Sequence, residues 1–163
     1  MREPFRLLVT GSRTWHDARV IEQALAVILD RHPEGVLLVH GACPRGADAI
    51  AAAYAARTSG YRTEAHPADW DRYGRAAGYR RNAEMIALGA DGCAAFIRDA
   101  SPGSTHAVRQ TRAAGIPVWL HTQPGRSRRG IYAGWSCPSS AWSWVTILAS
   151  APASAANSSA AWS

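Results

Sequence analysis

Glycine and polar residues gather in the stretch HGACPRGAD, which begins at His40 and ends at Asp48. It follows a short apolar run typical of a buried strand and precedes a segment of strong helix formers. At such a strand-to-helix turn, glycines let a ligand approach the backbone, and the free N–H groups of the helix N-terminus favour an anion. Arg45 adds a guanidinium that can bind a phosphate oxygen. The stretch therefore predicts either a phosphate-binding loop or a tight turn shaped by Gly41 and Gly46.

Three further stretches join an expected strand to an expected helix and carry similar residues. Residues 11–15 read GSRTW, residues 67–74 are dense in aromatic and charged side chains, and residues 101–105 read SPGST. Hydroxyls, guanidinium groups and backbone donors suit an anion, and an aromatic ring can stack on a base. Ordinary structural roles are the alternative, with Ser12 as a helix cap and Trp15 in the core.

Hydrophobic periodicity places these stretches between alternating strands and helices. The alternation predicts an α/β fold, a Rossmann-like three-layer sandwich with a mostly parallel five-stranded sheet and helices on both faces. Ligands of such sheets bind beyond the carboxyl ends of the strands, where the four stretches would converge. The expected strands are 5–10, 35–40, 61–66, 92–97 and 115–120, and the expected helices are 17–31, 47–57, 78–89 and 105–114.

Composition limits the classes of protein to which the chain can belong. The 163 residues have 18 basic against 12 acidic side chains, a formal net charge of +6, and every basic residue is an arginine. This excess is modest for a DNA-binding groove. Three widely spaced cysteines fit neither a disulfide framework nor a zinc site, and no apolar stretch is long enough to cross a membrane. We therefore expect a cytoplasmic protein without a metal site or a membrane partner.

A change of composition divides the chain after His121. Residues 1–121 hold the expected strands and helices and are expected to form one domain. Residues 122–163 start with a basic linker rich in glycine and proline and continue with alanine, serine and tryptophan, without an acidic residue. Such a segment has too little periodic apolar surface to offset the entropy of ordering, so we expect it to be poorly ordered.

Several motifs in order resemble the YspA-type branch of the SLOG superfamily. The motifs are Thr10–Arg13 with Trp15, His40–Asp48, His66–Trp70 and Gly78–Met85. The resemblance covers about residues 5 to 121 and implies a Rossmann-like domain that binds a nucleotide or a nucleotide-derived ligand. It also implies a role as a sensor or as a module of bacterial or phage signalling and conflict systems, and it implies a homodimer.

On this interpretation, the turns hold phosphate groups through backbone N–H groups, hydroxyls and arginines. An aromatic ring stacks on a base or a ribose, and a carboxylate accepts ribose hydroxyls. A nucleotide-type ligand is the only bound small molecule that the sequence implies. The predicted ligand-binding residues are Gly11, Ser12, Arg13, Trp15, Gly41, Ala42, Arg45, Gly46, Asp48, Asp69, Trp70, Arg81, Asn82, Gly103, Ser104 and Thr105.

A more distant resemblance to the Lonely Guy phosphoribohydrolases leaves an enzyme as the second possibility. The spacing Arg-x-x-x-Met that begins at Arg81 matches that family, and residues 102–105 partly match its Pro-Gly-Gly-x-Gly-Thr loop. No carboxylate follows this loop, where the family has its catalytic acid. Hydrolysis of an N-glycosidic bond in a nucleoside monophosphate would then require another acid. The candidates are Glu84 and Asp69, with Arg81 orienting the phosphate.

Binding of single-stranded DNA, as in the DNA-processing relatives of the superfamily, is the third possibility. It requires an extended basic track with interleaved aromatic side chains. The modest charge of residues 1–121 argues against such a track, although residues 126–129 supply further arginines. Nucleotide binding without cleavage is favoured, because it requires no missing catalytic group.

Overall fold

The computed structural model describes residues 3–123. The segment 124–163, which contains the predicted basic linker and tail, lies outside the described residues. No helix within residues 3–123 is long and apolar enough to cross a membrane. The strands are β1 (Phe5–Gly11), β2 (Val36–His40), β3 (Tyr61–Ala65), β4 (Gly92–Arg98) and β5 (Val118–Gln123), and the helices are α1 (Ala18–Arg31), α2 (Ala47–Arg57), α3 (Trp70–Tyr73), the short 3₁₀ helix η1 (Gly74–Ala76), α4 (Ala77–Ala87) and α5 (Pro102–Ala113).

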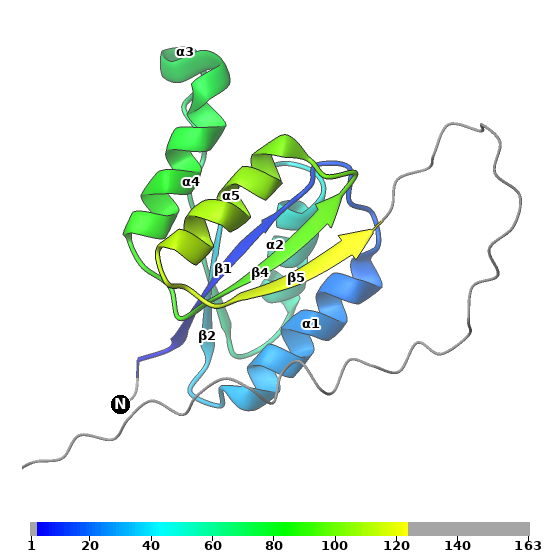
Figure 1. Ribbon diagram of the computed structural model, residues 1–163. Coiled ribbons are helices and arrows are strands. Elements are labelled where there is room, and N and C mark those ends of the chain that lie inside the picture. Colours follow the sequence, from blue (N-terminus) through cyan, green and yellow to red (C-terminus); the bar gives the residue numbers. More distant parts are fainter. Residues whose placement is uncertain (1–2, 124–163) are drawn as a thin grey trace, which may run out of the picture. The chain divides into compact units, whose positions relative to one another are not determined.

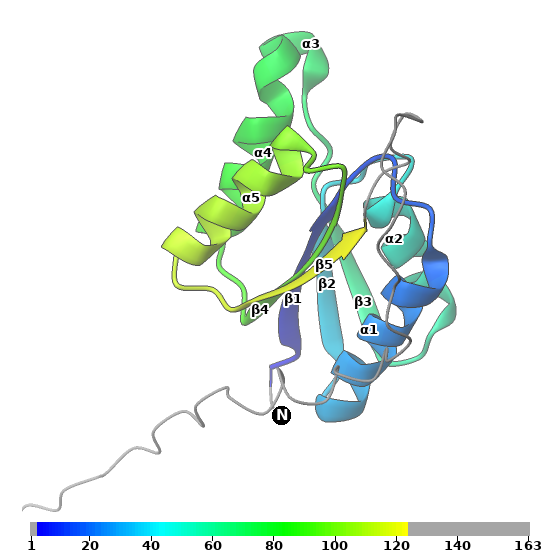
Figure 2. The same cartoon turned by 45° about the vertical axis from the view of Figure 1, so that its right-hand side comes forward.

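The five strands form one parallel sheet in the order β3-β2-β1-β4-β5 (Figure 1). Helices α1 and α2 cover one face of the sheet, and α4 and α5 cover the other (Figure 2). The predicted Rossmann-like α/β fold is thereby confirmed. The chain adds β2 and β3 on one side of β1 and then returns to place β4 on the other side. Such a reversal leaves a crevice at the carboxyl ends of the two central strands, here β1 and β4.

Each face of the sheet has its own apolar core. Trp15 and Phe96 belong to the core under α1 and α2, and Met85 and Val108 belong to the core under α4 and α5. All residues of β4 except Arg98 are buried. A strand buried on both faces has no polar side, which explains why β4 shows no alternation of polar and apolar residues.

The last helix is longer than expected, and the last strand lies three residues later in the chain than expected. α5 begins at Pro102 rather than at Thr105, because a proline fits the first turn of a helix, where its missing N–H is not needed. The carbonyl of Ser101 accepts the N–H of Thr105 at 2.9 Å and closes that turn. β5 continues to Gln123, past the expected end of the strand at Leu120.

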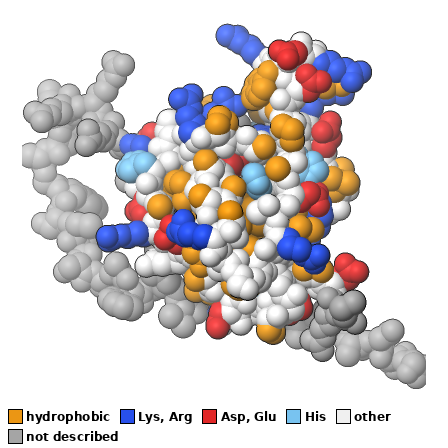
Figure 3. Space-filling model, turned by 180° about the vertical axis from the view of Figure 1, so that it is seen from behind, with side chains coloured by type: hydrophobic (Ala, Val, Ile, Leu, Met, Phe, Trp, Pro, Cys, Tyr) orange, Lys and Arg blue, Asp and Glu red, His pale blue; other side chains and the backbone are white. Residues whose placement is uncertain are grey.

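Residues 69–79, which we call the α3 projection, extend away from the sheet (Figures 1 and 2). The sequence predicted a loop over 67–74, but α3 forms there because the carboxylate of Asp69 accepts the N–H of Arg72 at 2.9 Å and caps the helix. Gly74 ends α3 with a φ of +47°, a conformation that favours glycine. Neither α3 nor η1 contains a buried residue. Charged side chains surround the tip of the projection (Figure 3).

Candidate functional site

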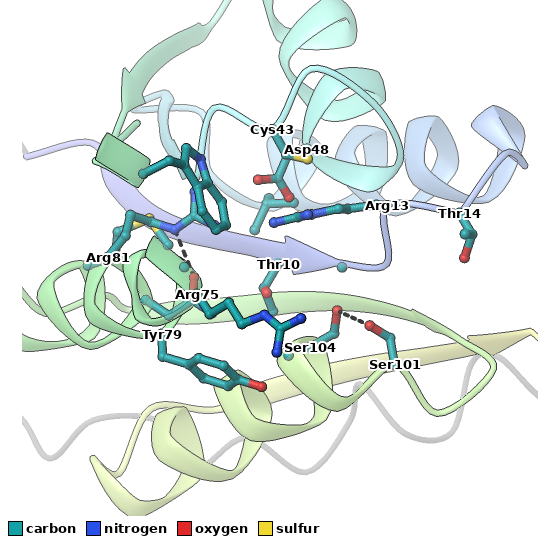
Figure 4. Close-up of a pocket in the computed structure, with 17 residues that line it drawn as sticks. Thr10, Arg13, Thr14, Cys43, Asp48, Arg75, Tyr79, Arg81, Ser101 and Ser104 are labelled. Carbon is teal, nitrogen blue, oxygen red and sulfur yellow. Dashed lines mark hydrogen bonds between the residues drawn. The ribbon is translucent and has the colours of Figure 1, made fainter. Parts of the chain in front are cut away.

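A pocket of about 390 Å³ lies at the carboxyl ends of β1 and β4, in the crevice that the strand order creates (Figure 4). Its walls come from the turn after β1, the turn after β2, the α3 projection, α4, and the turn that leads into α5. The residues that line the pocket are Val9, Thr10, Gly11, Arg13, Thr14, Cys43, Asp48, Trp70, Arg75, Gly78, Tyr79, Arg81, Asn82, Met85, Ser101, Gly103 and Ser104.

The pocket carries an excess of positive charge. Three arginines reach it from different walls: Arg13 from the turn after β1, Arg75 from η1 and Arg81 from α4 (Figure 4). Asp48 is the only acidic side chain among the described lining residues. Three guanidinium groups around one carboxylate produce a positive local potential, which favours an anionic ligand.

The carboxylate of Asp48 is held in place by backbone groups. It lies in the first turn of α2, is 6% exposed, and accepts the N–H of Gly41 at 3.1 Å as well as the N–H of Cys43. Burial raises the pKa of Asp48, whereas the guanidinium of Arg81 and the two N–H groups act in the opposite direction. The pocket therefore presents a fixed acceptor to a bound molecule.

Arg81 is tied to three neighbours. Its guanidinium donates to the carbonyl oxygen of Gly41 and, at 3.3 Å, to that of His66, and its Nε donates to Oδ1 of Asn82 at 2.9 Å. Burial lowers the pKa of Arg81, and the carboxylate of Asp48 opposes this shift. The ends of β2 and β3 thus set the orientation of the arginine before any ligand is bound.

The turn between β2 and α2 uses backbone donors within the protein. The N–H of Gly41 donates to Asp48, and the N–H of Ala42 donates to Nδ1 of His40 at 3.1 Å. The phosphate-binding interpretation of the turn required free N–H groups. The N–H groups of Gly41 and Ala42 are instead already bound within the protein. The turn contributes the side chains of Cys43 and Asp48 to the pocket instead.

Gly46 and Ser12 hold the turns around the pocket together. Gly46 has a φ of +77°, and a Cβ there would lie 2.6 Å from Cα of Arg13, so that the close approach of the two turns requires glycine. The carbonyl of Ser12 accepts the N–H of Ala47 at 3.3 Å. The hydroxyl of Ser12 accepts the N–H of Arg98 at 2.8 Å and donates to the carbonyl of the same residue at 3.1 Å. Both Ser12 and Gly46 were predicted to bind the ligand, and both have a structural role beside the pocket.

Trp15 is a core residue and does not line the pocket. It is 4% exposed, its ring packs edge-to-face on Phe96 at 5.5 Å, and its Nε1 donates to the carbonyl of Asp17 at 2.8 Å. A ring so enclosed is not accessible for stacking on a ligand, so the structural alternative for Trp15 is the correct one.

Other predicted residues also lie outside the pocket. Asp69 caps α3, Glu84 is exposed on α4, and Arg45 is exposed in the turn before α2. Thr105 lines a separate groove between α5 and β5. Neither Asp69 nor Glu84, the two candidates for a catalytic acid, is therefore among the residues that line the pocket. Gly41 and Ala42 are likewise absent from the lining.

Eight predicted residues do line the pocket, and several lining residues were not predicted. The predicted ones are Gly11, Arg13, Asp48, Trp70, Arg81, Asn82, Gly103 and Ser104. Of the others, Thr10 is a buried polar residue, 7% exposed, near the carboxyl end of β1. Its place at the carboxyl end of β1 was a signal that could have identified it. Arg75 lies in η1, which was not predicted, whereas Tyr79 lies in α4, within the helix expected over 78–89.

The two ends of the pocket offer different chemistry. The guanidinium of Arg75 points toward Ser104, near the N-terminus of α5 (Figure 4). Hydroxyls, a guanidinium and a helix N-terminus together suit a phosphate group. The carboxylate of Asp48 suits hydroxyl donors. Trp70 and Tyr79 are 48% and 44% exposed and can each offer a ring face to a planar group.

Comparison with known proteins gives two findings. The model of a family described as YspA, cpYpsA-related SLOG family matches residues 5–73. The chain is also similar to the Gene 61 protein of Mycobacterium phage D29, with 46% identity over 117 residues that cover 69% of this chain and 93% of that protein. No solved structure matches the chain.

Proposed function

This chain belongs to the YspA, cpYpsA-related SLOG family, and on that premise we propose that its pocket binds a nucleotide or a nucleotide-derived ligand. Membership of the family suggests a nucleotide-related ligand-binding module. The observation that carries the proposal is the set of three arginines around the fixed carboxylate of Asp48, placed where the strand order reverses.

In the proposed complex, a phosphate group lies between Arg75 and the start of α5. Thr10 and Ser104 line this end of the pocket with their hydroxyl groups, and the two residues are 7% and 6% exposed. The backbone N–H of Gly103 lies in the first turn of α5, where helix N–H groups have no partner within the helix. Arg75 supplies a charge-assisted hydrogen bond.

The ribose and the base occupy the remaining pocket. Asp48 accepts hydroxyl groups of the ribose, since a carboxylate is an acceptor only. The base stacks on Trp70 or Tyr79. Arg13 lies 5.1 Å from the ring of Trp70 in a cation–π contact, so its positive charge stands close to the proposed base.

Binding without cleavage, as in a ligand sensor, is the function that we favour. The two candidate acids, Asp69 and Glu84, do not line the pocket. One observation favours hydrolysis of the N-glycosidic bond as a second candidate, namely that Asp48 is a buried carboxylate with a raised pKa inside the pocket. Incubating the protein with nucleoside monophosphates and measuring free base separates the two functions. Base release that Asp48→Asn abolishes would establish the hydrolase.

A thermal-shift screen tests the binding proposal. Mono-, di- and cyclic nucleotides are added to the full chain, and a ligand at about 100 times its Kd stabilises the fold by about 2.7 kcal/mol. Arg75→Gln should reduce the shift in Tm at a given ligand concentration. Arg31→Gln is the matched control, because Arg31 is an exposed arginine at the far end of α1. The proposal fails if no nucleotide raises the Tm, or if both variants respond alike.

A further inference from the structure

Two polar side chains that line the pocket are buried, and hydrogen bonds within the protein fix the orientation of each. The carboxylate of Asp48 accepts the N–H groups of Gly41 and Cys43. Asn82 is 8% exposed, and Oδ1 of its amide accepts Nε–H of Arg81 at 2.9 Å. Buried polar groups that cannot turn toward another partner discriminate strongly between ligands that do and do not complement them.

The same hydrogen bonds decide what each side chain offers to a ligand. A carboxylate is an acceptor only, so Asp48 requires a donor. The amide oxygen of Asn82 is turned toward Arg81, because the opposite orientation would set two donors against each other. The amide nitrogen of Asn82 is then the group that remains for a ligand, and it is a donor only. The pocket thus combines a fixed acceptor with a fixed donor.

The acceptor and the donor belong to one chain of contacts. Gly41 donates its N–H to Asp48 at 3.1 Å and accepts the guanidinium of Arg81 at its carbonyl oxygen, and Arg81 in turn donates to Asn82. Asp48 and Arg81 lie above Thr10 in Figure 4, whereas the guanidinium of Arg75 lies below it. The pair is therefore separate from the proposed phosphate end of the pocket.

The exposure of the lining residues indicates which part of a nucleotide reaches this pair. Thr10, at the proposed phosphate end, is buried, as are Asp48 and Asn82. The rings of Trp70 and Tyr79 are exposed and lie at the rim. A base that stacks on either ring therefore leaves the phosphate and the ribose in the buried part of the pocket. The buried acceptor and donor then meet the sugar rather than the base.

We infer that the pocket selects ribonucleotides over 2′-deoxyribonucleotides, because Asp48 and Asn82 bind the two neighbouring hydroxyls of a ribose. One hydroxyl donates to the carboxylate of Asp48, and the other accepts an N–H of Asn82; a hydroxyl can do either. A 2′-deoxyribose lacks one of these partners, so one buried group stays unpaired. Such a loss lowers affinity by about ten- to a hundredfold. The inference rests on the proposed function and names the class of nucleotide.

Isothermal titration calorimetry of the full chain tests the inference with matched pairs of sugars. The probes are the 5′-mono- and diphosphates of adenosine and of uridine, each compared with its 2′-deoxy counterpart. We expect the ribonucleotide to bind about ten- to a hundredfold more tightly with either base. Equal affinity for the two sugars, or a preference that follows the base instead of the sugar, overturns the inference and leaves the proposed function intact. A protein that binds none of these probes also overturns the inference, and the thermal-shift screen then decides separately on nucleotide binding.

Two substitutions exchange the acceptor and the donor. In Asp48→Asn, the amide oxygen must face the N–H groups of Gly41 and Cys43, so the amide nitrogen is left for the ligand. In Asn82→Asp, one carboxylate oxygen still accepts Nε–H of Arg81, and the other is an acceptor. Each variant should abolish the preference for the ribonucleotide. The readout is the ratio of two affinities measured on one protein, so a general loss of affinity does not affect it.

Two control variants should keep the ratio. Asp30→Asn is the matched control for the loss of an acidic charge, because Asp30 is exposed on α1, which contributes no residue to the pocket. Arg75→Gln should weaken the binding of both sugars by the same factor, because Arg75 lies at the phosphate end. A ratio that survives both Asp48→Asn and Asn82→Asp, or that is lost in either control, overturns the assignment to this pair.

Discussion

The guanidinium of Arg81 donates a hydrogen bond to the carbonyl oxygen of Gly41, which links α4 to the turn after β2 beside the pocket. A Cβ at position 41 would overlap that guanidinium. Arg81 can therefore occupy its place in the structure only because residue 41 is a glycine and has no side chain. The pocket thus depends on a contact between residues far apart in the chain.

Gly41→Ala should displace Arg81 and weaken ligand binding. We expect a smaller nucleotide-induced shift in Tm, because the displaced arginine no longer lines the pocket in its present orientation. The check is a double-mutant cycle with Arg81→Gln, in which the nucleotide-induced shift is measured for each variant. If Gly41→Ala acts through the arginine, the double variant should bind no more weakly than Arg81→Gln alone. Additive losses would contradict the prediction.

Asp48→Ala should destabilise the fold. The substitution leaves the N–H groups of Gly41 and Cys43 without their acceptor, and an unsatisfied buried donor costs about 1–3 kcal/mol. Asp48→Asn retains an acceptor oxygen and should lower the free energy of unfolding by less. Urea unfolding of both variants without ligand measures the difference. Equal stability of Asp48→Ala and the unsubstituted chain would show that the carboxylate does not hold the turn.

Trp15→Ala should mainly reduce stability, and Trp70→Ala should mainly reduce ligand binding. Loss of the buried ring of Trp15 should lower the free energy of unfolding by about 3–5 kcal/mol. Trp70 is 48% exposed and packs against Arg13, so its loss should change stability by only about 1 kcal/mol. Trp70→Ala should instead weaken nucleotide binding in the thermal-shift screen. Normal binding by Trp70→Ala would remove the proposed stacking role and leave Tyr79 as the ring to test.

Glu64 should make the stability of the protein depend on acidic pH. Hydrogen bonds from Arg6, and then from His66, lower the pKa of Glu64 from 4.5 to about 2. Because the folded protein holds this proton less tightly than the unfolded chain, the stabilisation is complete above about pH 4.5 and disappears as the pH falls toward 2. Glu64→Gln should therefore lower the free energy of unfolding at pH 7, and the difference should shrink between pH 4.5 and 2. A difference that is constant over this range would contradict the assignment.

The architecture could be predicted from the sequence because the strands and helices have strong local signals. The apolar run of β4 and the amphipathic repeat of α1 each identify their element without knowledge of the partner. The alternation of strands and helices then limits the sheet to a parallel one with helices on both faces. The course of residues 67–74 was not predicted, because α3 consists of one turn that depends on the cap from Asp69.

The candidate site could be predicted only in part, because local sequence does not tell which polar or aromatic groups are used within the fold. Trp15 and Trp70 occur in similar turns, and only the packing of Phe96 on Trp15 distinguishes the core residue from the exposed one. The free N–H groups expected after β2 are occupied, because Asp48 and His40 fold back onto the turn. Interactions of this kind are set by the tertiary structure, so the sequence could indicate the edge of the sheet but not each contact.

The α3 projection has a consequence for how ligand preference can change during evolution. Its short helices α3 and η1 bury no side chain, yet Trp70 and Arg75 line the pocket. Substitutions in α3 and η1 leave both apolar cores untouched, so most should be tolerated by the fold. An exchange of α3 and η1 would therefore alter the wall of the pocket, and with it the preferred ligand, without changing the sheet or its cores.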